Sequence, residues 1–211
     1  MESTIPLLLI AVLAQSVPLS PPPSAIFISV DPRLDSVRLT SPAAGVSFDI
    51  DGDGDLEQVA WTEPGAAVAL LAIDRDGDGR ITTGAELFGS FSVLRAGNGP
   101  NALIETFKAT GAPLSGAVER GHMLYERLLL WMDKNHNGIS EESELRPWKE
   151  VFTAIGLGFV RQHRLDQHGN LFRYLGWAEL RTEGPEQGRA KDASEERQRR
   201  REYFEVVLKT W

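Results

Sequence analysis

The stretch that decides the fold reads Asp49-Ile-Asp-Gly-Asp-Gly-Asp55, with a carboxylate at every second position. The same spacing returns at Asp74-Arg-Asp-Gly-Asp-Gly-Arg80 and at Asp133-Lys-Asn-His-Asn-Gly-Ile139. Each stretch has side-chain oxygens at positions 1, 3 and 5, glycine at position 6 and a backbone carbonyl at position 7, as an EF-hand calcium loop does. Calcium takes six to eight oxygen ligands at about 2.3–2.6 Å, and glycine at position 6 allows the sharp turn that gathers them. The sequence therefore predicts three calcium loops, with Ca2+ as the cofactor.

The three loops differ in the carboxylate that follows them. An EF-hand closes with a bidentate glutamate at position 12. The third loop has Glu144 there, whereas the second has Ala85 at position 12 and Glu86 one residue later. The first has Ala60 at position 12 and a later carboxylate only at position 9, Glu57, which is typical of calcium loops on strand-rich scaffolds. The predicted metal ligands are Asp49, Asp51, Asp53, Asp55, Asp74, Asp76, Asp78, Arg80, Glu86, Asp133, Asn135, Asn137, Ile139 and Glu144.

The charge of the first loop supports a bound cation. Five acidic residues lie between Asp49 and Glu57, with no basic residue among them. At a spacing of roughly 5 Å and an effective dielectric near 20, each close pair repels by about 3 kcal/mol. The alternative is a set of three solvated turns, because Asp, Asn and Gly also form ordinary turns.

The composition restricts the class of protein. The chain has 211 residues and a net charge of −8. Hydrophobic residues make up 42% of it, which is enough for a packed core. The acidic balance argues against a nucleic-acid partner, because nucleic-acid affinity rests on basic surfaces. The absence of cysteine excludes disulfides, thiolate metal sites and a cysteine nucleophile. No catalytic residue is predicted.

The N-terminus indicates export. Residues 5–13 form an apolar run that is too short to span a bilayer, which needs about 20 residues. It fits the hydrophobic region of a signal peptide, with Val12 and Ala14 before a cleavage site, or alternatively an apolar tail. We therefore expect a secreted, periplasmic or cell-surface protein without a transmembrane span. The expected divisions are a signal peptide at 1–16, a proline-rich spacer at 17–24 and one calcium-binding domain at 25–211.

The hydrophobic pattern predicts an α+β fold. Leu124, Leu128 and Trp131 recur at helical spacing and predict a helix over 121–132, and Asn101 is the expected N-cap of another at 101–108. The alternating segments 157–165 and 171–180 flank a turn-rich pentapeptide and predict a hairpin. Further strands are expected at 25–30, 36–40, 58–62, 68–73 and 203–211, and short helices at 85–91 and after Ser140.

The motifs also resemble a known family. Phe48-Asp-Ile-Asp-Gly-Asp-Gly54, Leu71-Ala-Ile-Asp-Arg-Asp-Gly-Asp-Gly79 and Leu130-Trp-Met-Asp-Lys-Asn-His-Asn-Gly-Ile-Ser140 are similar to bacterial secreted EF-hand-like calcium-binding proteins. The same block occurs in repeat-in-toxin proteins. The resemblance implies calcium binding, export and an EF-hand-like pair at about 101–156, followed by a β-rich part at 157–211. Within that pair, the loop at 109–119 has lost its oxygens, so it departs from the family pattern.

The predicted function is that of an exported domain in which calcium acts as a structural clamp, with an unknown protein or surface partner. One alternative is a dockerin-like interaction module, which the uneven spacing of the three loops disfavours. Another is self-processing at Asp31-Pro32, because the self-processing module of related toxins cleaves itself at an Asp-Pro bond. That bond lies N-terminal to the first loop here, and nothing else in the sequence is predicted to match that module, which favours an extended segment in which Pro32 fixes φ. Enzymatic activity is therefore the less favoured alternative.

Overall fold

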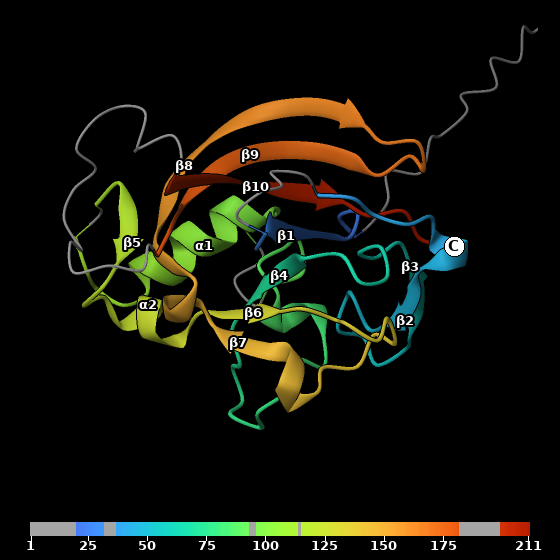
Figure 1. Cartoon of the computed structure of the whole chain (residues 1–211), viewed down its shortest axis with the longest axis horizontal. Coiled ribbons are helices and arrows are strands. Elements are labelled where there is room, and N and C mark those ends of the chain that lie inside the picture. The colour runs from blue at the N-terminus through green and yellow to red at the C-terminus, as the bar shows by residue number, and fades with distance from the viewer. Residues whose placement is uncertain (1–19, 32–36, 93–95, 114, 182–198) are drawn as a thin grey trace, which may run out of the picture.

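An eight-stranded antiparallel sheet forms the centre of the computed structural model, which describes residues 20–31, 37–92, 96–113, 115–181 and 199–211. The strand order is β5-β8-β9-β10-β1-β4-β6-β7. Figure 1 shows the sheet curling, with β8 and β9 arching over the other strands. The strands are β1 (Ser24–Ser29), β4 (Val68–Ala72), β5 (Ala117–Glu119), β6 (Leu129–Trp131), β7 (Leu145–Pro147), β8 (Phe152–Leu165), β9 (Leu171–Leu180) and β10 (Arg200–Val207).

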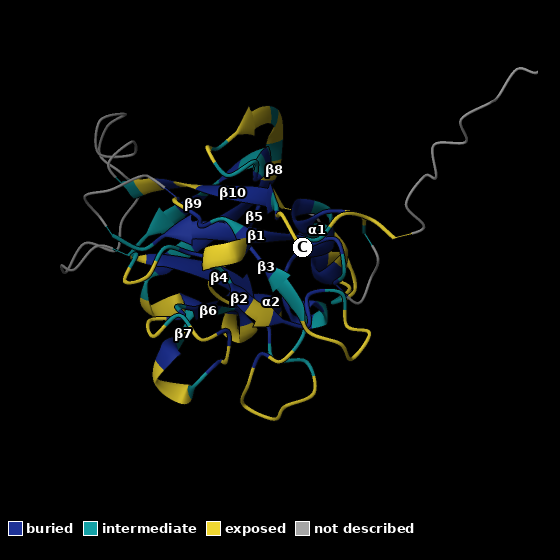
Figure 2. Cartoon of the chain, turned by 90° about the vertical axis from the view of Figure 1, so that its right-hand side faces the viewer, coloured by how far each residue is buried: buried dark blue, intermediate teal, exposed yellow. Residues whose placement is uncertain are grey.

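The central strands of the sheet, β1 and β4, are buried on both faces, so each face carries its own core. Phe27 of β1 belongs to one hydrophobic cluster, whereas its neighbours Ile26 and Ile28 belong to the other. This follows from the two-residue period of a strand, which points successive side chains to opposite faces. A second, two-stranded sheet of β2 (Val46–Phe48) and β3 (Glu57–Val59) contributes to the first core. Figure 2 shows that the buried residues lie in the sheet and the exposed ones mainly in the connecting loops.

The second core is covered by helices. The helix α1 (Gly99–Lys108) places Leu103 and Phe107 against it, and α2 (Met123–Arg127) adds Leu124. The cap of α1 is Asn98, whose Oδ1 accepts the backbone N–H of Asn101 at 2.9 Å, so the prediction of Asn101 as the N-cap is wrong. None of the helices in the described ranges is long and apolar enough to cross a bilayer.

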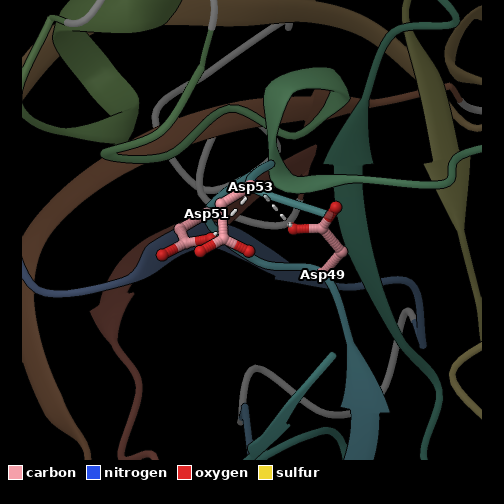
Figure 3. Close-up of side chains that lie close together, drawn as sticks. All are labelled: Asp49, Asp51 and Asp53. Atoms are coloured by element: carbon pink, nitrogen blue, oxygen red, sulfur yellow. Dashed lines mark hydrogen bonds between the residues drawn. The ribbon is translucent and has the colours of Figure 1, made fainter. Parts of the chain in front are cut away.

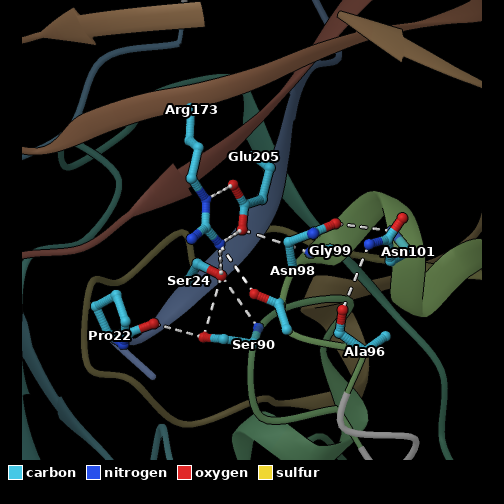
Figure 4. A network of polar contacts seen from close by, with 10 residues as sticks. Pro22, Ser24, Ser90, Ala96, Asn98, Gly99, Asn101, Arg173 and Glu205 are labelled. Atoms are coloured by element: carbon cyan, nitrogen blue, oxygen red, sulfur yellow. Dashed lines mark hydrogen bonds and ion pairs between the residues drawn. The ribbon is translucent and has the colours of Figure 1, made fainter. Parts of the chain in front are cut away.

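A buried ion pair connects α1 to the sheet (Figure 4). Glu205 of β10 is fully buried and accepts a hydrogen bond from Nε of Arg173, on β9, at 2.9 Å. Its other oxygen accepts the backbone N–H of Gly99, the first residue of α1, at 3.4 Å. A carboxylate at this position is stabilised by the positive end of the helix dipole. The pair therefore fixes the start of α1 against three strands, since Arg173 also contacts Ser24 of β1.

The expected α+β class with an EF-hand-like helical pair at about 101–156 is wrong. The protein is mostly β, and α1 and α2 are the two α-helices of the described residues. The expected helix at 121–132 ends at Arg127, and Leu129–Trp131 instead form β6, paired with β4 and β7. Residues 128–131 are apolar without interruption, which suits a strand buried on both faces as well as a helix. The sheet decides between them, because Leu130 reaches one core and Trp131 the other.

Helices that were expected beside the loops are single 3-10 turns. The segment 85–91 contains only η2 (Gly84–Glu86), which follows the capping residue Thr83. The expected helix after Ser140 is replaced by η3 (Glu142–Glu144), β7 and η4 (Trp148–Glu150). A further 3-10 turn, η1 (Pro42–Ala44), precedes β2. The third loop therefore joins two strands and not two helices.

Several strand predictions are confirmed. The strands β1 and β4 and the hairpin of β8 and β9 appear where the alternating pattern placed them, and β10 covers part of the expected last strand. The expected strand at 36–40 is reduced to a bridge between Leu39 and Thr62 in the described residues. The expected signal peptide at 1–16 lies outside the described residues.

The hairpin offers a test of this packing. A Cβ atom added to Gly176 of β9 would lie 2.0 Å from Cζ of Tyr203, which is buried in the second core. We expect Gly176→Ala to lower the free energy of unfolding by about 1–3 kcal/mol through overpacking. Gly158→Ala on β8 is the matched control, because a Cβ there meets no atom within 4 Å. Urea unfolding followed by circular dichroism measures both, and equal losses would contradict the proposed packing.

Candidate metal centres

The first loop runs from β2 to β3, and Asp49 organises it. The Asp49 carboxylate is 8% exposed and accepts the backbone N–H groups of Gly52 at 2.7 Å and Gly54 at 3.2 Å. Asp51 and Asp53 point toward the same space (Figure 3), and one carboxylate oxygen from each of the three lies within 4.8 Å of the others. Asp49 follows the short strand β2 directly, and it lies at the edge of the core because Phe48 before it is buried.

The second loop repeats this geometry at the end of β4. Asp74 accepts the N–H groups of Gly77 at 2.6 Å and Gly79 at 3.0 Å. Asp76 and Asp78 complete a second group whose oxygens lie within 4.8 Å of one another. The same local hydrogen bonds form because an Asp side chain closes a turn onto the backbone that follows it.

The third loop follows β6 and uses amides where the other two use carboxylates. Asp133 accepts the N–H groups of Asn137 at 3.1 Å and Gly138 at 2.9 Å. Asn135 and Asn137 occupy positions 3 and 5, so the loop carries less charge than the others. Its backbone is nevertheless the same, since position 4, His136, has a φ of 60° where the other loops have glycine. His136 is the one non-glycine residue with positive φ in the described chain, which shows how strongly the loop shape is imposed.

Each loop is closed by a glutamate that accepts the backbone N–H of position 2. Glu86 accepts from Arg75 at 3.2 Å, and Glu144 accepts from Lys134 at 2.8 Å. In the first loop the same role falls to Glu57, which accepts from Ile50 at 3.1 Å. Glu57 is therefore the counterpart of the two predicted closing residues, although it follows its loop more closely in sequence.

Glu141, like Glu57, is absent from the predicted ligands. Its Oε1 accepts the side-chain amides of Asn135 at 3.1 Å and Asn137 at 2.9 Å. Glu57 and Glu141 both stand at position 9 of their loops, which in an EF-hand supplies a ligand, often through water. The sequence already showed Glu57 at position 9, and the same position in the third loop could have pointed to Glu141.

The closing carboxylate of the third loop has unused capacity. Glu144 is 3% exposed, and its Oε1 accepts from Lys134 and Asn135. Its Oε2 is buried without a hydrogen-bond partner among the described residues. Leaving a buried carboxylate oxygen unpaired costs more than a neutral group would, and a cation removes that cost. The donor set thus fits a hard cation.

Three of the acidic groups, Asp51, Glu57 and Glu144, have raised pKa values, whereas hydrogen bonds from Asn137 and Glu144 lower the pKa of Glu141. Burial raises the pKa of Asp51, and the neighbouring Asp53 raises it further. Burial likewise raises the pKa of Glu57, with repulsion from Asp51 and Asp53 added. For Glu144, burial raises the pKa and the contact with Glu141 adds to it. The ionised forms of these three groups are therefore less favourable than that of a free carboxylate, and a proton or a cation relieves this.

The predicted ligands are not all brought together. Asp55, Arg80 and Ile139 at position 7 have exposed side chains, and their N–H groups donate to the position 5 side chain. They offer only a backbone carbonyl. The closing glutamates lie outside the aspartate groups whose oxygens are within 4.8 Å of one another among the described residues. Both oxygens of Glu86 already accept hydrogen bonds, from Arg75 and Thr82.

The three loops form one connected layer. The N–H of Ile81, after the second loop, donates to Oγ of Ser140, after the third, at 2.7 Å. The N–H of Gly84 donates to the carbonyl of Asp49 in the first loop at 2.8 Å. His136 completes the connection through a 2.8 Å contact to the carbonyl of Ala44, just before β2. The loops are far apart in sequence and adjacent in space.

The structure bears differently on the two alternative functions, a dockerin-like module and self-processing. A dockerin-like module needs helices beside its calcium loops, whereas the described residues on either side of these loops are strands and 3-10 turns. Asp31 follows β1, and Pro32 lies outside the described residues, so self-processing at that bond stays an untested prediction.

Comparison with known proteins defines the family. A model of the SPM domain matches residues 28–193, most of the chain. The protein therefore belongs to the SPM-domain family. It is also similar to the iron-regulated protein FrpA of Neisseria meningitidis serogroup C, with 34% identity over 138 residues. That region is 63% of this chain but only 12% of the relative, so the chain spans a small part of that protein.

The connected layer leads to a test. Ile81 is buried, so Ser140→Ala leaves its N–H without an acceptor, and we expect a loss of about 1–3 kcal/mol in the free energy of unfolding. Ser47→Ala is the control, because Ser47 is exposed and its hydroxyl bonds the side chain of the half-buried Gln58. Urea unfolding separates the two. A Ser140→Ala protein as stable as the Ser47→Ala protein would show that the contact contributes nothing.

Proposed function

We propose that the domain binds calcium in its three Asp/Gly loops, and that the ions clamp the loop layer onto the two cores. The observation that carries this proposal is the repeated geometry: in each loop, position 1 winds the backbone and a later glutamate closes it. The unpaired Oε2 of Glu144 is the second support, because it is buried beside the third loop. Three unrelated solvated turns have no reason to share this arrangement.

The donor chemistry favours calcium over other metals. All side-chain donors of the loops are carboxylate or amide oxygens, which suit hard cations, and the chain has no cysteine for softer ones. Magnesium demands near-ideal octahedral geometry and keeps several waters, whereas calcium accepts many oxygens in flexible arrangements. The mixture of side-chain and carbonyl oxygens in these loops is of the second kind.

The position of the loops supports a structural role. Each begins where a buried strand ends, with Phe48, Ile73 and Trp131 as the last or next-to-last apolar residues. The acidic charge is thus held close to both cores. A bound cation would neutralise that charge and add to the hydrogen bonds that already join the loops.

We also infer that the domain works outside the cytosol. The support is the apolar run at 5–13 with small residues after it. Calcium loops of extracellular modules bind with dissociation constants of about 10⁻⁴–10⁻³ M, which suits a structural ion in a calcium-rich medium.

Thermal melting tests the clamp. With dissociation constants of about 10⁻⁴–10⁻³ M, 10 mM calcium adds roughly 1.4–2.7 kcal/mol of stability per site by mass action. We expect a clear rise of Tm in calcium and a much smaller one in magnesium, measured by circular dichroism against a chelator. Identical melting curves in calcium and in chelator would end the proposal.

Titration calorimetry tests the closing glutamates. Glu144→Gln removes the charge that the third ion meets, so we expect loss of most of the affinity of that site. Glu57→Gln is expected to weaken the first site in the same way, and Glu86→Gln the second. Glu142→Gln is the control, because Glu142 is exposed on the same 3-10 turn as Glu144. Unchanged stoichiometry and affinity in Glu57→Gln would remove this residue from the ligands.

A further inference from the structure

The strand β8 has an outer edge that is only partly paired. Its residues Ala154–Gly156 pair with β5, and the N–H of Leu157 donates to the carbonyl of Gly116. From Gly158 to Leu165, no strand of the described residues lies on the side away from β9. Figure 1 shows β8 as the outermost long strand of the curled sheet. Unpaired strand edges offer a row of backbone N–H and carbonyl groups to another extended chain.

An apolar hollow lies next to this edge. It has a volume of about 610 Å³ and extends over β8, β9 and β10. Its apolar lining includes Val160, Leu175 and Trp177, and β10 adds the charged residues Arg200, Arg201 and Glu202. Val160 pairs with Leu175, which pairs with Phe204 of the first core, so the hollow continues the face of that core. Val160 is 58% exposed, and a Cβ at Gly158 would meet no atom within 4 Å. A side chain of an added strand therefore has an apolar place to occupy.

The charge of this edge is opposite to that of the protein. β8 contains Arg161, His163 and Arg164 and no acidic residue, in a chain with a net charge of −8. The guanidinium of Arg164 lies 3.6 Å from the ring centroid of Phe172, which holds it over the sheet. The same strand from a second copy would bring arginines against arginines, which costs energy. The edge thus favours an acidic partner over self-association.

We propose that the outer edge of β8 from Gly158 to Leu165 binds an extended acidic peptide segment as an additional strand. Backbone hydrogen bonds to the edge would supply affinity, and an apolar side chain in the hollow at Val160 would set the register. Carboxylates of the peptide would pair with Arg161 and Arg164. The inference goes beyond calcium binding, because the edge includes none of the residues assigned to the loops.

The arginines of β8 have a simpler explanation, which the experiment must distinguish from peptide binding. Natural edge strands often carry charged residues that prevent pairing with other chains. If protection were their whole role, no peptide would bind at this edge. A matched selection distinguishes the two explanations.

The experiment selects short random peptides displayed on phage against the full chain in calcium, with the Val160→Asp protein as the counter-selection. We expect enriched peptides that are acidic with alternating apolar residues. Their affinity, measured by fluorescence polarisation, falls at least about tenfold in Val160→Asp and in Arg161→Glu, since each removes one part of the recognition. Met123→Asp and Arg146→Glu are the matched controls, because Met123 is similarly exposed and Arg146 lies on β7 at the opposite edge of the sheet. Their affinities are expected to stay within about twofold.

Amide hydrogen exchange locates the bound peptide. Protection confined to Gly158–Leu165 supports the added strand. The proposal is overturned by enrichment that is equal on wild type and Val160→Asp, by neutral or basic enriched peptides, or by protection elsewhere. A dimer through β8 in sedimentation, without peptide binding, would overturn it in favour of a second copy. Arg161→Glu changes an exposed side chain, so it keeps the test valid if Val160→Asp unfolds.

Discussion

The loop layer depends on a cluster of three aromatic rings. Phe48, Trp61 and Trp131 are all buried, and their ring centroids lie 5.3–5.4 Å apart. Such contacts stabilise by about 0.5–1.5 kcal/mol per pair beyond the burial of area. Phe48 directly precedes the first loop, and Trp131 lies two residues before the third. The cluster therefore brings strand ends that are distant in sequence to one place, and the acidic loops follow from there.

The three loops reach the same geometry from different sequences. Position 1 is always an aspartate whose two oxygens hold the following backbone, and this part is local. The closing glutamate is not local, because Glu57 lies on β3 while Glu86 and Glu144 end 3-10 turns. These three residues share one contact: their carboxylate accepts the backbone N–H of position 2. The geometry of such a loop therefore depends also on the strand or 3-10 turn that follows the loop and carries its closing glutamate.

The limits of prediction are clearest at residues 128–131. Leu128-Leu-Leu-Trp131 is apolar throughout, and its helical spacing with Leu124 favoured one long helix. β4 pairs with β1 along one edge and with β6 along the other. In β6, Leu130 and Trp131 are buried on opposite faces of the sheet. The pairing of β4 with β6 joins residues about sixty positions apart, so nothing in the local pattern reveals it. The hairpin of β8 and β9 was predictable because its partners are adjacent in sequence and one turn sets their register.

The amino-acid sequence by itself determined the position of the three oxygen-rich loops and the residues at positions 1, 3 and 5. These depend on short-range hydrogen bonds between an aspartate and the next few N–H groups, together with glycines that accept a positive φ. Only the tertiary structure decided that strands and not helices carry the loops. It alone also decided that Glu57 closes the first loop, and that Ser140 and Gly84 join the three into one layer. The physical reason is that burial on both faces of a sheet selects among locally equivalent conformations through contacts that the local sequence does not contain.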